Sequence, residues 1–177
     1  MINDTSECSI IVADDDPDNL IILSEMLEQD GYVVRAYNNG LQVIESAEKM
    51  PPDMFLLDVH MGVLDGYETC LELKRNKNLK DIPIIFISGL SESYNKVRGF
   101  ELGAVDYINK PFSLAEVKSR VKTHITLGVM IKELREMNAG MINREVRVIE
   151  LKEEVNKLSK ELGRKPPYDA VWEDKIT

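Results

Sequence analysis

The sequence has few cysteines and few aromatic residues: its 177 residues include two cysteines, Cys8 and Cys70, and a single tryptophan. Two isolated cysteines are too few for a disulfide framework, and they lack the paired spacing of a thiolate metal site. We therefore interpret both as reduced thiols, which favours a cytoplasmic protein.

Long apolar runs are also absent. No apolar segment approaches the roughly 20 residues that span a bilayer as a helix. Residues 1–7 are polar, unlike the start of a signal peptide. The sequence therefore predicts no membrane association and supports the cytoplasmic location.

Positive charge is scarce in the first part of the chain. The formal net charge is −9; residues 1–125 carry 12 Lys and Arg against 21 Asp and Glu, whereas residues 126–177 carry ten of each. An acidic domain repels the phosphates of nucleic acids, and no basic stripe, helix-turn-helix or nucleotide-binding glycine loop follows residue 125. We expect no nucleic-acid partner and no enzymatic output domain in this chain. Clustered carboxylates would instead attract a divalent cation.

Short apolar segments alternate with helical patterns in this acidic part. Most of the apolar segments are uninterrupted, which is typical of strands covered on both faces, and each is followed by apolar residues at helical spacing. The alternation predicts an α/β fold, a doubly wound parallel sheet of five strands flanked by five helices. The predicted strands span residues 9–13, 32–37, 54–57, 82–87 and 104–109.

Polar side chains follow four of these strands. They are Asp14 with Asp15, Asp58, Ser88 and Lys110. Taken singly, each has an ordinary explanation as a turn residue, a helix cap or a solvated charge. Because ligands of open parallel sheets bind in the crevice outside the carboxyl ends of the strands, four such ends together favour one shared site.

Five strings of residues carry a resemblance to a known family. They are IVADDDP at 11–17, LDVHM at 57–61, DGYE at 65–68, ISG at 87–89 and NKPF at 109–112. With these strings in this order at the strand ends, residues 8–125 resemble the receiver domain of two-component response regulators. The resemblance implies the flavodoxin-like strand order 2-1-3-4-5 and a cis bond between Lys110 and Pro111.

The resemblance also implies a reaction and a cofactor. Asp58 would be the nucleophile that takes a phosphoryl group from a phosphohistidine of a sensor histidine kinase or phosphotransfer protein. Mg²⁺ would be bound directly by Asp15 and Asp58, by the backbone carbonyl of His60, and by Asp14 through a water molecule. The chain would then be a phosphoacceptor that catalyses its own phosphorylation and dephosphorylation, not an enzyme with an output reaction.

Three further residues complete the implied site. Lys110 and the Ser88 hydroxyl would stabilise the charge of the transferred phosphoryl group. Tyr107 matches the aromatic position that turns inward, following Ser88, after phosphorylation. Two departures from the family pattern, Gly62 in place of a common proline and the bulky His60, bear on how long the phosphoryl group persists.

Residues 126–163 have a different pattern, an apolar seven-residue repeat that predicts a coiled coil continuing the fifth helix. Only Arg144 interrupts it, Asn138-Ala139-Gly140 is poor helix sequence, and a parallel in-register pair would bring Arg147 near Lys152 of the other chain. Antiparallel pairing and folding back remain open alternatives. The two rows of the repeat are Leu127, Leu134, Met141, Val148, Val155 and Leu162, and Met130, Met137, Arg144, Leu151 and Leu158.

The sequence thus divides into three predicted parts: a receiver at 1–125, a coiled-coil extension at 126–163, and a proline-containing tail or linker at 164–177 with Trp172. A rod of this kind needs a partner helix, so we expect a homodimer through the C-terminal helix. The output would be a downstream protein or a domain missing from this chain.

Two other functions fit parts of the sequence. A phosphohydrolase of the haloacid dehalogenase type would place its nucleophile in Asp14-Asp15-Asp16, but that hypothesis leaves Asp58 unexplained. A coiled-coil scaffold with a phosphorylation-independent receiver is the second alternative, against which the complete set of acids, serine and lysine argues.

Overall fold

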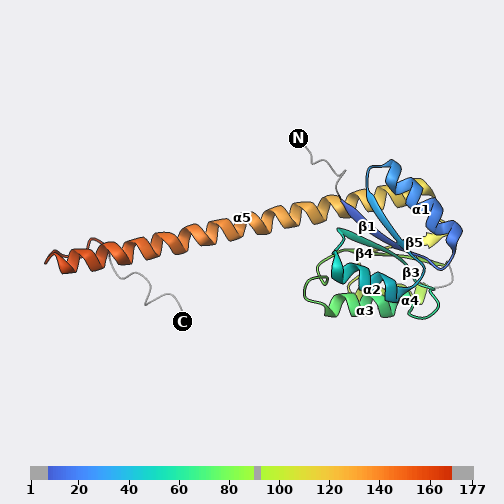
Figure 1. Ribbon diagram of the computed structural model, residues 1–177, viewed down its shortest axis with the longest axis horizontal. Helices are drawn as coiled ribbons and strands as arrows, with labels where there is room; N and C mark the ends of the chain where they lie inside the picture. Colours follow the sequence, from blue (N-terminus) through green and yellow to red (C-terminus); the bar gives the residue numbers. More distant parts are fainter. Residues whose placement is uncertain (1–7, 90–92, 169–177) are drawn as a thin grey trace. The chain divides into compact units, whose positions relative to one another are not determined.

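The computed structural model describes residues 8–89 and 93–168, and it shows ten regular elements within them (Figure 1). The strands are β1 (Ser9–Ala13), β2 (Val33–Tyr37), β3 (Met54–Asp58), β4 (Ile84–Gly89) and β5 (Asp106–Lys110). The helices are α1 (Pro17–Gln29), α2 (Gly40–Lys49), α3 (Gly66–Arg75), α4 (Ser93–Glu101) and α5 (Leu114–Glu161). The chain forms two compact units, Met1–Val129 and Met130–Thr177.

The five strands form one parallel sheet in the order β2-β1-β3-β4-β5. The predicted fold and strand order are therefore confirmed. Several strand bounds differ from the prediction: β2 begins at Val33, β3 includes Asp58, and β5 runs from Asp106 to Lys110 instead of from 104 to 109. β4 begins at Ile84 because Pro83 has no N–H and the Ile82 amide already donates to Leu79 in a turn. β4 also continues to Gly89, so that Ser88 lies inside the strand rather than after it.

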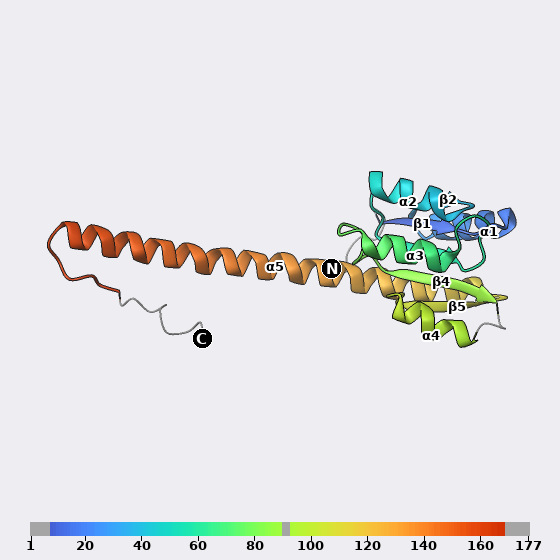
Figure 2. The same ribbon diagram turned by 90° about the horizontal axis from the view of Figure 1, so that it is seen from below.

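Helices cover both faces of the sheet. In Figure 1, α1 and the first turns of α5 lie on one face, and α2, α3 and α4 lie on the other; Figure 2 shows these three in that order across their face. Alternate residues of the strands point to the two faces, so Val12 packs with Leu23 of α1 and Val121 of α5, while Leu57 packs with Val43 and Cys70. Burial of each such side chain stabilises the fold by about 1.5–3 kcal/mol.

Side-chain caps fix where three helices begin. Asp16 is the N-cap of α1 and accepts from the Asp18 amide, and Asn39 caps α2 by accepting from the Gln42 amide. Asp65 and Glu68 form a reciprocal capping box at the start of α3. These caps set the helix N-termini that follow β1, β2 and β3, which is the edge of the sheet where the predicted site lies.

The last helix, α5, is unbroken over 48 residues, and Asn138-Ala139-Gly140 does not interrupt it. Its first turns bury Val117, Val121 and Ile125. It ends at Glu161, and the φ of 66° at Gly163 lets the Gly163 and Arg164 amides donate back to the carbonyls of Lys160 and Ser159. Within the described residues, none of the helices has an apolar stretch that could cross a bilayer.

Candidate functional site

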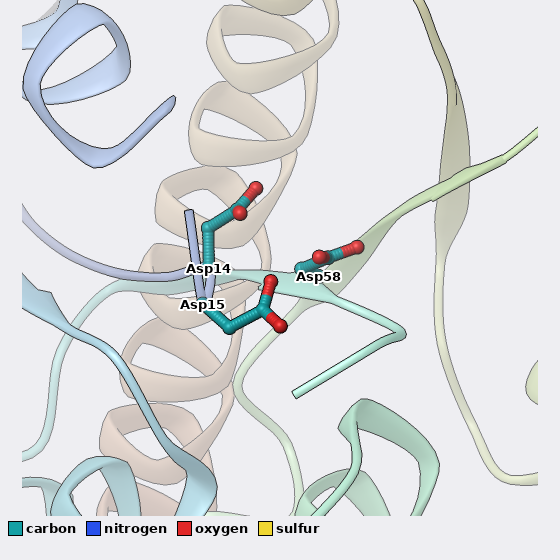
Figure 3. A group of neighbouring side chains, drawn as sticks. All are labelled: Asp14, Asp15 and Asp58. Carbon is teal, nitrogen blue, oxygen red and sulfur yellow. The ribbon is translucent and has the colours of Figure 1, made fainter. Parts of the chain in front are cut away.

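Three carboxylates meet at the carboxyl ends of the two central strands (Figure 3). Asp14 and Asp15 follow β1, and Asp58 is the last residue of the neighbouring strand β3. One oxygen from each of the three lies within 4.8 Å of the others. Asp14 is 0% and Asp58 2% exposed, whereas Asp15 is open to solvent. The predicted convergence of these side chains is thus present in the structure.

Lys110 brings the balancing positive charge from the far side of β4. It is the last residue of β5, and its Nζ lies 2.8 Å from Asp58 Oδ2 and 2.9 Å from Asp14 Oδ2. The peptide bond between Lys110 and Pro111 is cis, as the resemblance implied. Buried carboxylates are costly unless they are paired, so this one ammonium neutralises part of the charge of both.

Burial acts differently on the pKa values of Asp58 and Lys110. Burial raises the pKa of the Asp58 carboxyl, and the Asp14 charge adds to the rise, whereas hydrogen bonds from Lys110 and from the His60 backbone oppose it. Burial alone would lower the pKa of Lys110, but its hydrogen bonds to Asp58 and Asp14 outweigh that effect and raise it. The charged form of Lys110 is therefore favoured by its partners, whereas for Asp58 the burial and the Asp14 charge outweigh the hydrogen bonds that favour the carboxylate.

Two residues that sequence reasoning missed hold the acids in place. Asn19, in the first turns of α1, donates from Nδ2 to both oxygens of Asp14 at 3.2 and 3.1 Å. The Asp16 amide also donates to Asp14, at 2.9 Å. Gly66 lets the start of α3 press against the backbone of Asp58, because a Cβ there would overlap the Asp58 carbonyl. Gly66 belongs to the DGYE string quoted above, but its contact with Asp58, like the role of Asn19, depends on packing between elements that the local sequence does not show.

Ser88 lies on β4, the strand next to β3 and its Asp58, and Tyr107 lies one strand further away, on β5. Strand register places Asp58 opposite Ile87, next to Ser88, and Ser88 opposite Asn109. Among the described residues, nothing hydrogen-bonds the Ser88 hydroxyl, which is fully buried. A buried hydroxyl in that state is available to a group that enters the site.

Tyr107 is turned inward and is 5% exposed. Its ring lies 5.2 Å from the rings of Phe86 and Phe100, measured between centroids. Its hydroxyl end occupies the place that a Cβ would take on Gly99 of α4. The inward position of the ring therefore depends on a glycine at residue 99.

The donor set fits a hard divalent cation such as Mg²⁺. Three carboxylate oxygens are close enough to share one ion, and the exposed Asp15 leaves one side open to water. The side chain of His60 is exposed, and its backbone meets Asp58 through a hydrogen bond. The arrangement can therefore present Asp58 as a fixed carboxylate nucleophile beside the Lys110 ammonium and the buried Ser88 hydroxyl.

The sequence of the chain is similar to those of known proteins. The family model of the response regulator receiver domain matches residues 10–122. A probable cyclic di-GMP phosphodiesterase of Vibrio cholerae is 41% identical over 124 residues, which are 70% of this chain and 28% of that protein. The chain thus spans well under half of that relative.

Solved structures agree with this match. A putative response regulator from Chloroflexus aurantiacus aligns with a TM-score of 0.65 and 31% identity, covering 67% of this chain and 98% of that one. A second structure is the receiver domain of a sensor histidine kinase from Pseudomonas aeruginosa, which was solved with a magnesium ion coordinated in its active-site cleft. It aligns with a TM-score of 0.63 and 30% identity, and the alignment covers 67% of this chain and 98% of that one. Together with the acids and the lysine at the strand ends, the match over more than half of its length shows that the chain belongs to the response regulator receiver domain family.

Proposed function

We propose that Asp58 accepts a phosphoryl group from a phosphohistidine carried by a sensor histidine kinase or a phosphotransfer protein. One observation carries the proposal: Asp58 is a buried carboxylate at a strand end, held among two further acids and in contact with Lys110. A buried acid cluster of this kind is unfavourable for stability alone, so a chemical role is the better explanation.

The proposed transfer exchanges one bond for another. A carboxylate oxygen of Asp58 attacks phosphorus, the phosphorus–nitrogen bond of the phosphohistidine breaks, and the imidazole leaves with that electron pair and takes up a proton. The product is an acyl phosphate. Lys110 lies where its ammonium can stabilise the charge on the phosphoryl oxygens. The Ser88 hydroxyl, which no residue in the described part of the chain hydrogen-bonds, is the matching donor from β4.

Mg²⁺ is the proposed cofactor. Asp15 and Asp58 would hold it directly, together with the backbone carbonyl of His60, and Asp14 through a water molecule. It would supply positive charge to the phosphoryl oxygens and relieve the repulsion among the acids. Asn19 and Lys110 keep Asp14 in position for this purpose.

The proposed output is a change in shape and pairing. Phosphorylation would draw the Ser88 hydroxyl toward the new phosphoryl group, with Tyr107 held inward against Gly99, and would shift the pairing of two copies through α5. The receiver would work in the cytoplasm, without nucleic acid as a partner. Its signal would pass to a downstream protein or to an output domain outside this chain.

The test is phosphate incorporation from acetyl phosphate with Mg²⁺, measured by intact mass. We expect labelling of the wild type, and its loss both in Asp58→Asn and when EDTA removes the cation. Asp14→Asn is the matched control: labelling that survives Asp58→Asn but vanishes in Asp14→Asn would support the dehalogenase-type hydrolase. No labelling in any form, with folded protein by circular dichroism, would leave the phosphorylation-independent scaffold.

A further inference from the structure

The second half of α5 has an apolar stripe that its own unit leaves uncovered. Between 39% and 71% of the surface of each apolar residue in the stripe is exposed. The residues recur three and four positions apart, so they share one face of the helix. We call this face the seam: Leu134, Met137, Met141, Val148, Leu151, Val155, Leu158 and Leu162.

We propose that the occupant of the seam is the seam of a second copy of this chain, running parallel and in register. The inference rests on the homodimer proposed above and adds its direction and alignment. Three observations carry it: the residue types along the seam, the place of Arg144, and the partners that two flanking charges have within their own chain.

The residue types of the seam differ along its length. In heptad notation, the first a positions are Leu134 and Met141, the first apolar d position is Met137, and the last a position is Leu162. In the two heptads between them, β-branched Val148 and Val155 occupy a, and Leu151 and Leu158 occupy d. That distribution favours two parallel strands over higher oligomers, because the two layers accept side chains at different angles.

Arg144 fixes the alignment. It occupies the single polar d position of the seam, and Glu145 follows it at e. In a parallel in-register pair the two arginines lie in one layer, and the hole that receives each d side chain includes the e residue of the facing helix. Each guanidinium then meets Glu145 of the partner subunit. A parallel pair shifted by one heptad places Arg144 against Leu151 or Met137 instead, where the e residues are Lys152 and Asn138 and no carboxylate is supplied.

The like-charge contact that opposed parallel pairing is weakened by contacts within the chain. Arg147 Nη1 lies 2.9 Å from Glu150 Oε2, one turn along the same helix. Lys152 Nζ lies 5.6 Å from the ring centroid of Tyr168, in the segment that follows α5. Two hydrogen bonds with Asn156 hold Tyr168 there. Both cations therefore already have attractive partners when the helices meet.

Disulfide trapping in the full-length chain tests the alignment. In a Cys8→Ser background, Val155→Cys and Met137→Cys place a thiol in the seam, and Glu153→Cys places one on the opposite face as the control. Cys70 can stay, because burial raises the pKa of its thiol to about 11. Positions 137 and 155 lie roughly 27 Å apart along the helix, so a mixed disulfide between them cannot form in a parallel pair.

We expect Val155→Cys and Met137→Cys each to form a disulfide-linked dimer under mild oxidation, the Glu153→Cys control to stay unlinked, and a mixture of the two seam variants to give no mixed product. A mixed product without the homotypic ones would overturn the parallel arrangement and keep the dimer. A monomeric mass in solution at every concentration would overturn the pairing itself. Acetyl phosphate labelling of the same samples reports separately on Asp58.

Discussion

At the scale of single residues, the site is a balance of buried charges around Lys110. One ammonium serves two carboxylates that are almost inaccessible to solvent. The structure thus stores electrostatic repulsion that a bound cation would relieve.

The pH dependence of stability follows from Asp58. Its pKa is raised in the folded chain above the ordinary value of 3.8, so the folded state holds this proton more tightly than the unfolded state. Relative to Asp58→Asn, the wild type in EDTA should be most stable below the ordinary carboxyl pKa. It should lose stability as the pH rises toward the raised value, then level off. Urea unfolding across a pH series measures this difference; a difference that grows in favour of the wild type with rising pH would contradict the argument.

Gly99 determines where the Tyr107 ring lies. A methyl group there would overlap the tyrosine hydroxyl, so Gly99→Ala should drive the ring from its place between Phe86 and Phe100. We expect a loss of about 1–3 kcal/mol in unfolding free energy and a changed near-ultraviolet circular dichroism. The control is Gly99→Ala with Tyr107→Ala, compared with Tyr107→Ala alone: without the ring, the added methyl should be neutral or mildly stabilising. Equal losses with and without the ring would rule this explanation out.

At the scale of elements, two glycines of the C-terminal unit have opposite roles. Gly140 lies inside α5 with open space around it, whereas Gly163 has a positive φ and lies just after the end of the helix. Gly140→Ala should raise stability by about 0.5–1 kcal/mol, and Gly163→Ala should lower it by about 1 kcal/mol. Far-ultraviolet circular dichroism during thermal unfolding measures both. The same sign for the two variants would mean that the end of the helix is not fixed by Gly163.

The positions of the strands and helices show which parts of the fold and of the site can be predicted from the sequence. Strand ends and their acids were predictable, because uninterrupted apolar runs identify buried strands and parallel strands share a carboxyl edge. The roles of Asn19 and Gly99 were not predictable. In the sequence, Asn19 is an ordinary polar residue of a helix and Gly99 an ordinary weak helix former. Their roles come from the contacts that Asp14 and Tyr107 make with them in the fold. Ser88 was predicted as a site residue but at a position after its strand; it lies inside β4 because the strand continues past its apolar run to Gly89.

At the scale of the whole molecule, Arg144 in the proposed dimer lowers the affinity between the two copies but fixes the register of their helices. Arg144→Leu removes two charges from the seam, so we expect the dissociation constant to fall by about tenfold or more. The variant should also populate trimers or shifted alignments. Lys157→Leu, which removes the same charge at a position outside the seam, is the control. Sedimentation equilibrium compares them, and weaker association of Arg144→Leu would contradict the proposed place of Arg144.

The hydrogen bonds between Asn156 and Tyr168 fix the position of Tyr168, the last described residue, beside α5. Because the segment after Gly163 turns back along its own helix, Tyr168 lies level with Asn156, roughly 8 Å short of the end of α5. Anything joined to the chain after that point starts from the flank of the helix rather than from its tip. In the parallel pair the two attachment points stand at equal height on neighbouring helices, so two fused copies of any protein would begin as a matched pair.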